Sequence, residues 1–490
     1  MKGSSILQPN IMSESEAHNT SDNVPLFVDL DGTLIKSDLL VESAFALIKQ
    51  SPVALFSIPV WLMQGKAKLK RELAQRTTID VTGLPQQESF VAYLREQARL
   101  RPVYLATASD LLHAQPIADH LGFFAGVLAS NGSHNLKGRN KLQEILKVSN
   151  GGPFDYAGDA AADLPIWAKA RRAILVNPAP GVRRAAGKIA SVEQVFNDCP
   201  VAWRTWVRAL RLHQWAKNSL LAVPLLTAHL FTPAAVATTL IACVAFGLVA
   251  SATYLLNDLL DLASDRHHPR KRQRPFAAGN LTLPAGVLAL IVLLAGGLAL
   301  ATTLSSQFLA VLLVYLGLTL AYSLCFKTYM LLDVLLLAAL YTVRIIAGAF
   351  AIQVPLSSWL LAFSMFLFLS LALVKRSAEL LSLKQLARDA ASGRDYQVTD
   401  YGMLSAMGIA AGYVAVLVLA LFVDSTAGHG HYRYPQLLWL LCPAMLYWIS
   451  RVWMKTARGE MHDDPIVFSL RDRASWIVFV SMIVTMLVAI

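Results

Sequence analysis

The chain has 490 residues, of which 55% are hydrophobic and 15% are charged, and its formal net charge is +11. Soluble globular domains carry about 25% charged residues, so this composition excludes an ordinary soluble protein and predicts several membrane spans. The basic residues are scattered between apolar segments, which excludes nucleic acid as the expected partner and favours cytoplasmic loops and anionic ligands.

The N-terminal part is predicted to be a soluble domain behind a disordered tail. Residues 1–23 are polar and lack the apolar run of a signal peptide, so we expect the N-terminus to stay in the cytosol. Residues 24–198 alternate short β-rich runs with helical stretches, which is typical of an α/β fold with a Rossmann-like parallel sheet. A mostly helical insert at about 36–100 is expected to form a cap on this domain.

Two segments of this region raise the question of membrane contact. Residues 53–63 are apolar, but the run is interrupted by Pro59 and is shorter than the ~20 residues that a span needs. We expect the cap to bury this run, and contact with the membrane is the alternative. In the linker at 199–217, Trp203 and Trp206 lie on one helical face and arginines on another, which is typical of an interfacial helix. A plain soluble linker helix is the alternative there.

Residues 218–490 are predicted to form an all-α polytopic membrane domain. About nine apolar segments follow one another, and most have the length that crosses a bilayer as a transmembrane helix. The loops after the second, sixth and eighth segments are rich in Lys and Arg, whereas the loops on the other side are nearly free of them. The positive-inside rule places the basic loops in the cytoplasm, on the same side as the soluble domain.

Two carboxylates alternate directly after the first β-rich run, at Asp29 and Asp31. Residues two apart on a strand point the same way, so one can attack phosphorus while the other shuttles a proton. Further polar residues follow in chain order: Thr107, Lys141, Asp159 and Asp163. Phosphoryl transfer needs these parts, because a hydroxyl and a lysine bind the charged oxygens and carboxylates hold Mg²⁺.

This ordered set resembles the four motifs of the haloacid dehalogenase superfamily, over about residues 24–195. The resemblance implies that Asp29 is the nucleophile that forms an aspartyl phosphate and that Asp31 is the general acid and base. It implies that Thr107 and Lys141 hold the phosphoryl group. It also implies a Mg²⁺ site, whose metal-binding residues are Asp29, Asp31, Asp159 and Asp163. The helical cap resembles that of the phosphoserine-phosphatase-like branch.

A second acidic motif follows the second apolar segment and consists of Asn257, Asp258, Asp261 and Asp265. By helical rotation its three aspartates lie within about 60° on one face. Three like charges there repel one another, so a divalent cation is the expected partner, and Mg²⁺ accepts carboxylate oxygens. A solvated polar helix end is the alternative. The basic cluster that follows includes Lys271, Arg272 and Arg274. It suits phosphates, or else it only marks the topology.

The acidic motif and Arg266 resemble the first Asp-rich motif of the UbiA superfamily of intramembrane transferases, and the resemblance extends over about residues 205–490. It implies that Asp258 and Asp261 are catalytic, and that Asn257, Asp258, Asp261 and Asp265 hold Mg²⁺ and a substrate diphosphate. Aromatic prenyltransferases of this superfamily carry a second pair of aspartates. This chain departs from them, because it has Tyr322, Lys327 and the single Asp333 there.

Other residues favour one branch of that superfamily. They are His213-Gln214-Trp215-x-Lys217-Asn218, Lys375-Arg376 with Glu379, and the last loop, from His462-Asp463-Asp464-Pro465 through Arg471-Asp472-Arg473. Arg344 lies about 16 Å along the fifth segment, where an arginine usually faces a polar cavity or forms a structural ion pair. Together these residues resemble the decaprenyl-phosphate phosphoribosyltransferases. The resemblance implies these substrate-binding residues: Lys217, Asn218, Arg266, Lys271, Arg272, Arg274, Tyr322, Lys327, Asp333 and Arg344.

The resemblances predict a membrane enzyme with two chemistries. We expect Mg²⁺-dependent transfer of 5-phosphoribose from phosphoribosyl diphosphate to a polyprenyl phosphate, with a fused phosphatase that dephosphorylates the product. The alternative is a UbiA-type prenyltransferase that moves a polyprenyl group to an aromatic or other small acceptor. A membrane scaffold or transporter is the third hypothesis. The protein is expected to be multi-pass in the cell inner (cytoplasmic) membrane with both sites cytosolic, and homo-oligomerisation stays open.

Overall fold

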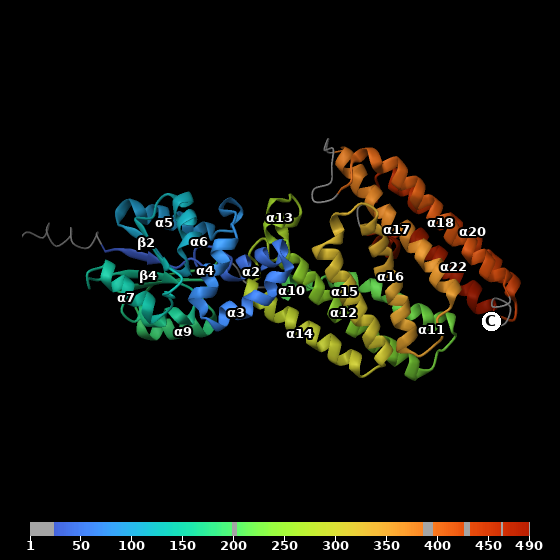
Figure 1. The fold of residues 1–490 in the computed structure, drawn as a ribbon, viewed down its shortest axis with the longest axis horizontal. Coiled ribbons are helices and arrows are strands. Elements are labelled where there is room, and N and C mark those ends of the chain that lie inside the picture. Colours follow the sequence, from blue (N-terminus) through green and yellow to red (C-terminus); the bar gives the residue numbers. More distant parts are fainter. Residues whose placement is uncertain (1–23, 198–202, 386–394, 426–431, 462–463, 490) are drawn as a thin grey trace, which may run out of the picture. The chain divides into compact units, whose positions relative to one another are not determined.

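A computed structural model describes residues 24–197, 203–385, 395–425, 432–461 and 464–489 (Figure 1). The expected disorder of residues 1–23 and the linker residues 198–202 lie outside the described residues. The chain forms two compact units. The first contains the described residues up to Ala209 together with Leu255–Leu288, and the second contains Leu210–Tyr254 and the described residues from Ala289 onwards.

The first unit is built on a six-stranded sheet in which every neighbouring pair of strands is parallel. The strands are β1 (Leu26–Val28), β2 (Val103–Asp110), β3 (Gly126–Ser130), β4 (Asp155–Gly158), β5 (Arg172–Val176) and β6 (Val192–Phe196). Their order is β3-β2-β1-β4-β5-β6, so the order reverses between β1 and β4. In open α/β sheets ligands bind at this reversal, beyond the carboxyl ends of the strands. The predicted parallel α/β sheet is confirmed.

Helices cover both faces of this sheet. Figure 1 shows α5 (Glu88–Leu100) and α6 (Leu111–Leu121) on one side, with α7 (Arg139–Val148) and α9 (Pro180–Ile189) on the other. The short strand β1 is entirely apolar because both of its faces are buried. Leu26 and Val28 pack in the same core cluster as Phe90 of α5, whereas Phe27 faces the opposite cluster with Phe154. The tightly held end of β1 is therefore a rigid place from which to position the side chain that follows it.

The cap lies between β1 and α5 in the sequence. It consists of α2 (Leu39–Gln50), η1 (Pro52–Phe56), α3 (Ser57–Met63), α4 (Lys66–Arg76) and η2 (Val81–Gly83). Helix α2 begins after the N-cap residue Asp38, whose side chain accepts a hydrogen bond from the Val41 N–H (3.1 Å). Leu47, Leu69 and Leu73 form a small buried cluster that holds α2 and α4 together.

The expectation that the cap buries the apolar run of residues 53–63 is wrong. Val53, Phe56 and Met63 are 72%, 77% and 89% exposed. The cap is a single layer of short helices with one small apolar cluster, so it covers only one side of this run. The other side stays exposed within the described structure.

Seven helices in the described part of the chain are long and apolar enough to cross a membrane. They lie in α12 (Pro233–Leu260), α14 (Leu283–Thr302), α15 (Ser306–Leu324), α16 (Leu332–Ala351), α17 (Ser358–Gln385), α18 (Tyr401–Asp424) and α20 (Leu441–Ala457), which η8 (Pro435–Leu440) precedes. Helix α13 (Leu262–His267) and the turn η5 (Lys271–Gln273) connect α12 to α14, and α21 (Pro465–Arg471) follows α20. The chain is therefore a multi-pass membrane protein.

The predicted number of nine transmembrane helices is not confirmed. The first expected segment, at 219–233, falls on the end of η4 (Leu212–Ala222) and on α11 (Val223–Thr227) instead of forming one long helix. The last, α22 (Arg473–Ala489), has 17 residues, at the lower limit of a span. Helix α10 (Trp203–Ala209) has an exposed Trp203, and its predicted place in the membrane interface stays a prediction.

Candidate functional sites at the sheet edge and the acidic helix

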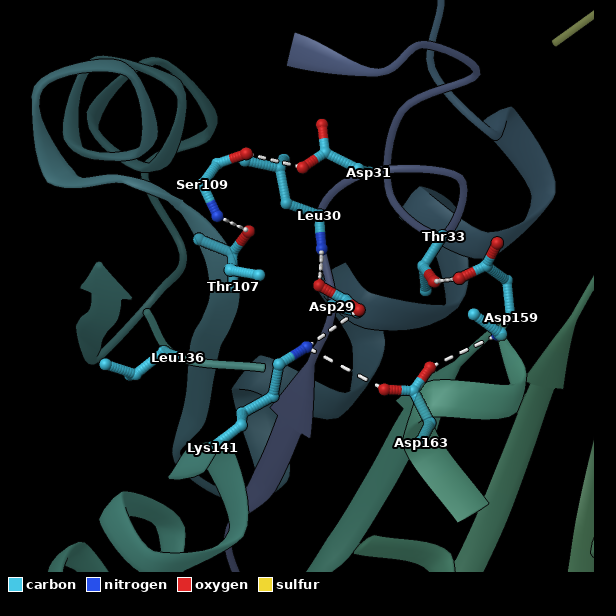
Figure 2. Close-up of polar contacts among 12 residues, drawn as sticks. Asp29, Leu30, Asp31, Thr33, Thr107, Ser109, Leu136, Lys141, Asp159 and Asp163 are labelled. Carbon is cyan, nitrogen blue, oxygen red and sulfur yellow. Dashed lines mark hydrogen bonds and ion pairs between the residues drawn. The ribbon is translucent and has the colours of Figure 1, made fainter. Parts of the chain in front are cut away.

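Asp29 follows β1 directly, at the point where the strand order reverses. Its Oδ1 accepts a hydrogen bond from the next backbone N–H (2.8 Å), and its Oδ2 lies 2.7 Å from the Lys141 Nζ. Gly32 has a φ of +78°, and a Cβ there would collide with the Asp159 carboxylate, so the turn requires glycine. Thr33 donates from Oγ1 to Asp159 Oδ1 (3.3 Å). The loop after β1 therefore closes against the loop after β4 (Figure 2).

Lys141, on α7, is a buried cation among carboxylates (Figure 2). Its Nζ lies 2.7 Å from Asp29 Oδ2 and 3.8 Å from Asp163 Oδ1, and it donates to the Tyr156 hydroxyl at 2.9 Å. Burial alone lowers the pKa of Lys141, but the charges of Asp29 and Asp163 outweigh burial and raise the pKa above its ordinary value. The side chain therefore stays charged at neutral pH, as the binding of phosphoryl oxygens requires.

Three carboxylates at this sheet edge, Asp29, Asp159 and Asp163, converge and are called the edge carboxylates below. One oxygen of each lies within 4.8 Å of the others, and the described residues contain no second group of this kind. Burial, and then the charges of Asp29 and Asp163, raise the pKa of Asp159 to about 8. A bound cation relieves this repulsion, and Mg²⁺ takes carboxylate oxygens. The edge carboxylates thus have the donor chemistry for the predicted ion.

Asp31 lies apart from this group, at the start of the cap (Figure 2). Its Oδ1 accepts from the Leu39 N–H (2.9 Å) and its Oδ2 accepts from the Ser109 hydroxyl (2.5 Å). Burial and the charge of Asp38 raise the pKa of Asp31 to about 7. A carboxyl group that exchanges its proton near neutral pH suits a general acid and base. The sequence also predicts Asp31 as a metal ligand, but its carboxylate is not among the three that converge.

Thr107 is fully buried near the end of β2, and its Oγ1 accepts a hydrogen bond from the Ser109 N–H (3.0 Å). Sequence reasoning missed two residues at this edge. Ser109 holds Asp31, and the polar run at the end of β2 was a signal for it. Lys70 of α4 donates to a backbone carbonyl of β2 (2.5 Å) and to Asn135 Oδ1 (3.0 Å). Nothing in the sequence around Lys70 indicated this contact.

The acidic motif of the first unit lies where α12 passes into α13. Asp261 is a turn residue between the two helices, yet the helical hydrogen bonds continue through it. The Asp261 N–H donates to the Asn257 carbonyl (3.0 Å), and the Asp265 N–H donates to the Asp261 carbonyl (2.8 Å). Asn257 is half-buried beside them. The motif is thus helical, as the sequence predicts.

Asp258, Asp261 and Asp265, called the helix aspartates below, contact basic side chains of the same unit. The Arg274 Nη1 lies 3.2 Å from Asp258 Oδ1 and 2.6 Å from Asp265 Oδ2. The Lys49 Nζ of the cap helix α2 lies 2.7 Å from Asp261 Oδ1. The sequence predicts that Mg²⁺ balances the negative charge of these aspartates. In this structure the side chains of Arg274 and Lys49 balance part of that charge instead.

Arg266, a predicted substrate-binding residue, makes a buried ion pair with the cap. Its Nη1 lies 2.6 Å from Glu42 Oε1 and its Nη2 lies 3.1 Å from Glu42 Oε2, with Ser37 Oγ at 3.4 Å. Both charged side chains are at most 8% exposed. Lys271 and Arg272, by contrast, are exposed. Within the first unit, α2 thus contacts the acidic helix through both Glu42 and Lys49.

A cluster of basic residues surrounds Asp464 in the second unit. Asp464 Oδ2 lies 2.7 Å from the Lys217 Nζ and 3.7 Å from the Lys375 Nζ, and accepts a hydrogen bond from the Tyr341 hydroxyl (3.0 Å). Burial favours the protonated form of Asp464, but Lys217 and Lys375 outweigh it and lower the pKa to about 2. Two lysines, one buried and one half-buried, therefore share one buried carboxylate.

Arg344 in α16 belongs to the same region of the second unit. Its Nε donates to Asn218 Oδ1 (3.4 Å) and its Nη2 donates to the Tyr315 hydroxyl (3.2 Å). Its guanidinium carbon also lies 5.2 Å from the Phe246 ring centroid and 5.8 Å from that of Tyr341. The structure thus brings the predicted residues Lys217, Asn218 and Arg344 into one neighbourhood.

The remaining predicted substrate-binding residues lie elsewhere in the second unit. Asp333 is fully buried: its Oδ2 pairs with the Arg376 Nε (2.5 Å) and its Oδ1 accepts from the Tyr396 hydroxyl (2.5 Å). Arg376 also donates to the Tyr322 hydroxyl (3.2 Å). Lys327 lies half-buried in η6 (Phe326–Thr328). Asp333 and Tyr322 are therefore engaged in a buried ion-pair network.

Known proteins match both parts of the chain. Residues 219–469 match the UbiA prenyltransferase family. An uncharacterized protein, y4nM of Sinorhizobium fredii, is 40% identical over 464 residues, which cover 93% of this chain and 89% of that protein. A decaprenyl-phosphate phosphoribosyltransferase of Mycobacterium tuberculosis is 37% identical over 179 residues, which cover 36% of this chain and 59% of that protein. An apo phosphoserine phosphatase structure is 15% identical over 36% of this chain and 94% of its own, with a TM-score of 0.26. The chain belongs to the UbiA prenyltransferase family.

Proposed function

We propose that the membrane half transfers 5-phosphoribose from phosphoribosyl diphosphate to a polyprenyl phosphate. The carrying observation is the cluster of buried Lys217 and Arg344 with the half-buried Lys375, in which Asp464 is the carboxylate that pairs with both lysines. Such an excess of positive charge suits phosphate groups, which both substrates carry. The identity with decaprenyl-phosphate phosphoribosyltransferases supports the same choice.

In this proposal a phosphate oxygen of the lipid forms a bond to the anomeric carbon of the ribose, and the bond from that carbon to the diphosphate breaks. The helix aspartates and Asn257 offer the oxygen ligands that Mg²⁺ accepts, once Arg274 and Lys49 give up their contacts. When bound, Mg²⁺ supplies positive charge to the leaving diphosphate. Lys217 and Arg344 hold and orient phosphate groups.

The soluble half, in the same proposal, is a phosphatase. Asp29 Oδ attacks phosphorus, and the ester bond breaks as Asp31 gives its proton to the leaving oxygen. Asp31 then takes a proton from the water that hydrolyses the aspartyl phosphate. Lys141, charged and 2.7 Å from Asp29, binds the phosphoryl oxygens. The edge carboxylates would hold Mg²⁺, which neutralises the phosphoryl group.

The substrate of this phosphatase is proposed to be the 5-phosphate of the lipid-linked product. Helix α2 supports this link between the two chemistries. Its first N–H holds Asp31 of the phosphatase, and its side chains Glu42 and Lys49 contact Arg266 and Asp261 of the acidic helix. A single rigid helix thus contacts both sets of catalytic residues within the first unit.

The decisive test uses membranes that contain the protein, Mg²⁺, a polyprenyl phosphate and radiolabelled phosphoribosyl diphosphate. Asp261→Asn should abolish entry of label into the lipid. Asp29→Asn should leave label entry intact, but the lipid-linked sugar should keep its 5-phosphate. Asp119→Asn, an exposed residue of α6, is the matched control and should behave as wild type. No label in lipid with a folded wild type would refute phosphoribosyl transfer.

Prenyl transfer to an aromatic or other small acceptor is the second candidate, and membership of the prenyltransferase family favours it. The single Asp333 argues against it, because its carboxylate is held by Arg376 and Tyr396 rather than offered to a second metal ion. Transfer of label from an isoprenyl diphosphate to an aromatic acceptor, with none from phosphoribosyl diphosphate, would replace the first candidate by this one.

A further inference from the structure

An apolar surface of the cap, formed by Val53, Phe56, Val60 and Met63, is called the cap face below. These four residues are between 52% and 89% exposed. Their spacing of three, four and three residues places them on one side of the helical run Pro52–Met63. The run contains no charged residue. An exposed patch of this kind marks an interaction surface.

The opposite side of the same run has a partner. Ala54, Ile58 and Trp61 pack against the small cap cluster that contains Leu47 and Leu73. The Trp61 ring also lies 4.8 Å from the guanidinium carbon of Arg76, on α4. The run is therefore anchored to the cap by one side and presents the cap face with the other.

The charges around the cap face indicate what covers it. Lys66 and Lys68 follow the run and are both exposed, and Lys68 also pairs with Glu72 of α4 (2.6 Å). Apolar residues flanked by lysines are typical of a helix that lies in the lipid headgroup region. Protein interfaces are depleted in lysine, so this border favours anionic headgroups over a second protein. The run of 12 residues is too short to cross a bilayer.

The unit that carries the cap face also contains parts of two membrane helices. The first unit contains Leu255–Leu288, and therefore the last residues of the membrane helix α12 and the first residues of α14. The cap belongs to the same compact unit. A surface of the unit that is apolar and flanked by basic residues thus has a membrane available to it.

We propose that the cap face docks the phosphatase on the lipid surface, with its apolar side chains among the acyl chains and the flanking lysines among anionic headgroups. The consequence, which rests on the proposed function, concerns the substrate class. A docked cap holds the edge carboxylates beside the membrane surface, so the phosphatase takes phosphate groups that are attached to lipids.

The first experiment measures docking without reference to activity. The full chain, with its four native cysteines replaced by serine, is placed one copy per lipid nanodisc. An environment-sensitive fluorophore is attached at Phe56→Cys, or at Met63→Cys, and brominated lipids are added as quenchers. Leu112→Cys on α6, an apolar position that is 43% exposed, is the matched control. We expect quenching at positions 56 and 63 but not at 112, and stronger quenching with anionic lipid. Equal quenching at all three positions would overturn the proposal, and so would none at 56 and 63.

The second experiment changes the cap face by Phe56→Glu with Met63→Glu. Both side chains are exposed, so the fold should survive, and an unchanged rate on a water-soluble aryl phosphate verifies this. Hydrolysis of a lipid-linked sugar phosphate should fall by about tenfold, because burial of the two side chains in lipid is lost. An unchanged rate on the lipid substrate would refute the consequence for the substrate. Quenching without any lipid-phosphate hydrolysis by the wild type would refute the proposed phosphatase function and leave the docking intact.

Discussion

The edge carboxylates and the helix aspartates, both in the first unit, balance their negative charge in different ways. The edge carboxylates converge to within 4.8 Å and Lys141 is the basic side chain among them, so the pKa of Asp159 rises to about 8. The helix aspartates form no such group among the described residues, and Arg274 and Lys49 pair with them. The edge carboxylates keep an excess of negative charge, whereas basic side chains of the protein balance most of the negative charge of the helix aspartates.

The two sets of carboxylates are therefore prepared for a cation in different ways. One oxygen of each edge carboxylate already lies within 4.8 Å of the others, so small side-chain movements suffice for them to accept Mg²⁺. The helix aspartates must first exchange protein cations for a metal ion. We therefore expect metal binding at the second set to be coupled to movement of Arg274 and Lys49, and hence to the cap that carries Lys49.

The largest effect is expected from Lys141→Ala, which removes the basic side chain among the edge carboxylates. Phosphatase turnover should fall about 10²- to 10³-fold, because the phosphoryl oxygens lose a preorganised charge. Lys141→Arg should retain part of the activity, and phosphoribosyl transfer should be unchanged in both variants. Steady-state hydrolysis of an aryl phosphate, with lipid labelling as the parallel assay, measures the effect. A wild-type phosphatase rate in Lys141→Ala would show that the contrast in charge has no role in catalysis.

The regular geometry of a parallel sheet explains why the sequence can indicate Asp29 and Asp159 together, whereas strand alternation pairs Asp29 with Asp31, which lies outside the edge carboxylates. Asp29 and Asp159 each follow a strand, and neighbouring parallel strands end at the same edge. The ion pairs of the helix aspartates could not be predicted in this way. Lys49 and Asp261 are 212 residues apart, and no periodicity relates them.

In the membrane half, hydropathy likewise predicted only part of the structure. It found the long apolar helices, but it did not show that the apolar segment at 219–233 falls on the end of a 3₁₀ helix and a short α-helix rather than on a span. It also did not show which side of the apolar run in the cap was covered, because a small cluster buries one side and leaves the cap face exposed. Burial depends on how much apolar surface neighbouring elements offer, and composition alone does not state that.

A smaller effect is expected from Arg274→Gln, which tests the second half of the comparison. Arg274 contacts two helix aspartates, so its loss removes two charged hydrogen bonds, each worth about 1.5–3 kcal/mol. Transfer should slow about 10- to 100-fold if the arginine also holds substrate phosphate, as the sequence predicts. Arg95→Gln, at an exposed position of α5, is the matched control for loss of one positive charge and should stay near wild type. Equal rates in the two variants would show that the pairing in this structure is irrelevant to transfer.

The smallest effect is expected from Glu42→Gln, which addresses the link between the cap and the acidic helix. The change leaves Arg266 buried with a neutral partner, and such a loss costs about 1–3 kcal/mol of stability. Thermal unfolding of the detergent-solubilised protein should therefore begin at a lower temperature. Glu88→Gln, on α5 and exposed, gives the control for loss of one negative charge.

The informative outcome of Glu42→Gln is its pattern over the two reactions. Glu42 touches neither the edge carboxylates nor the helix aspartates in the described contacts, but the helix that carries it holds Asp31 and contacts Arg266. If α2 couples the two sites, both hydrolysis and transfer should slow, and addition of Mg²⁺ should not restore the transfer rate. A change in transfer alone would mean that Arg266 affects only the transfer site. The two activities would then lie in one chain without being coupled through α2.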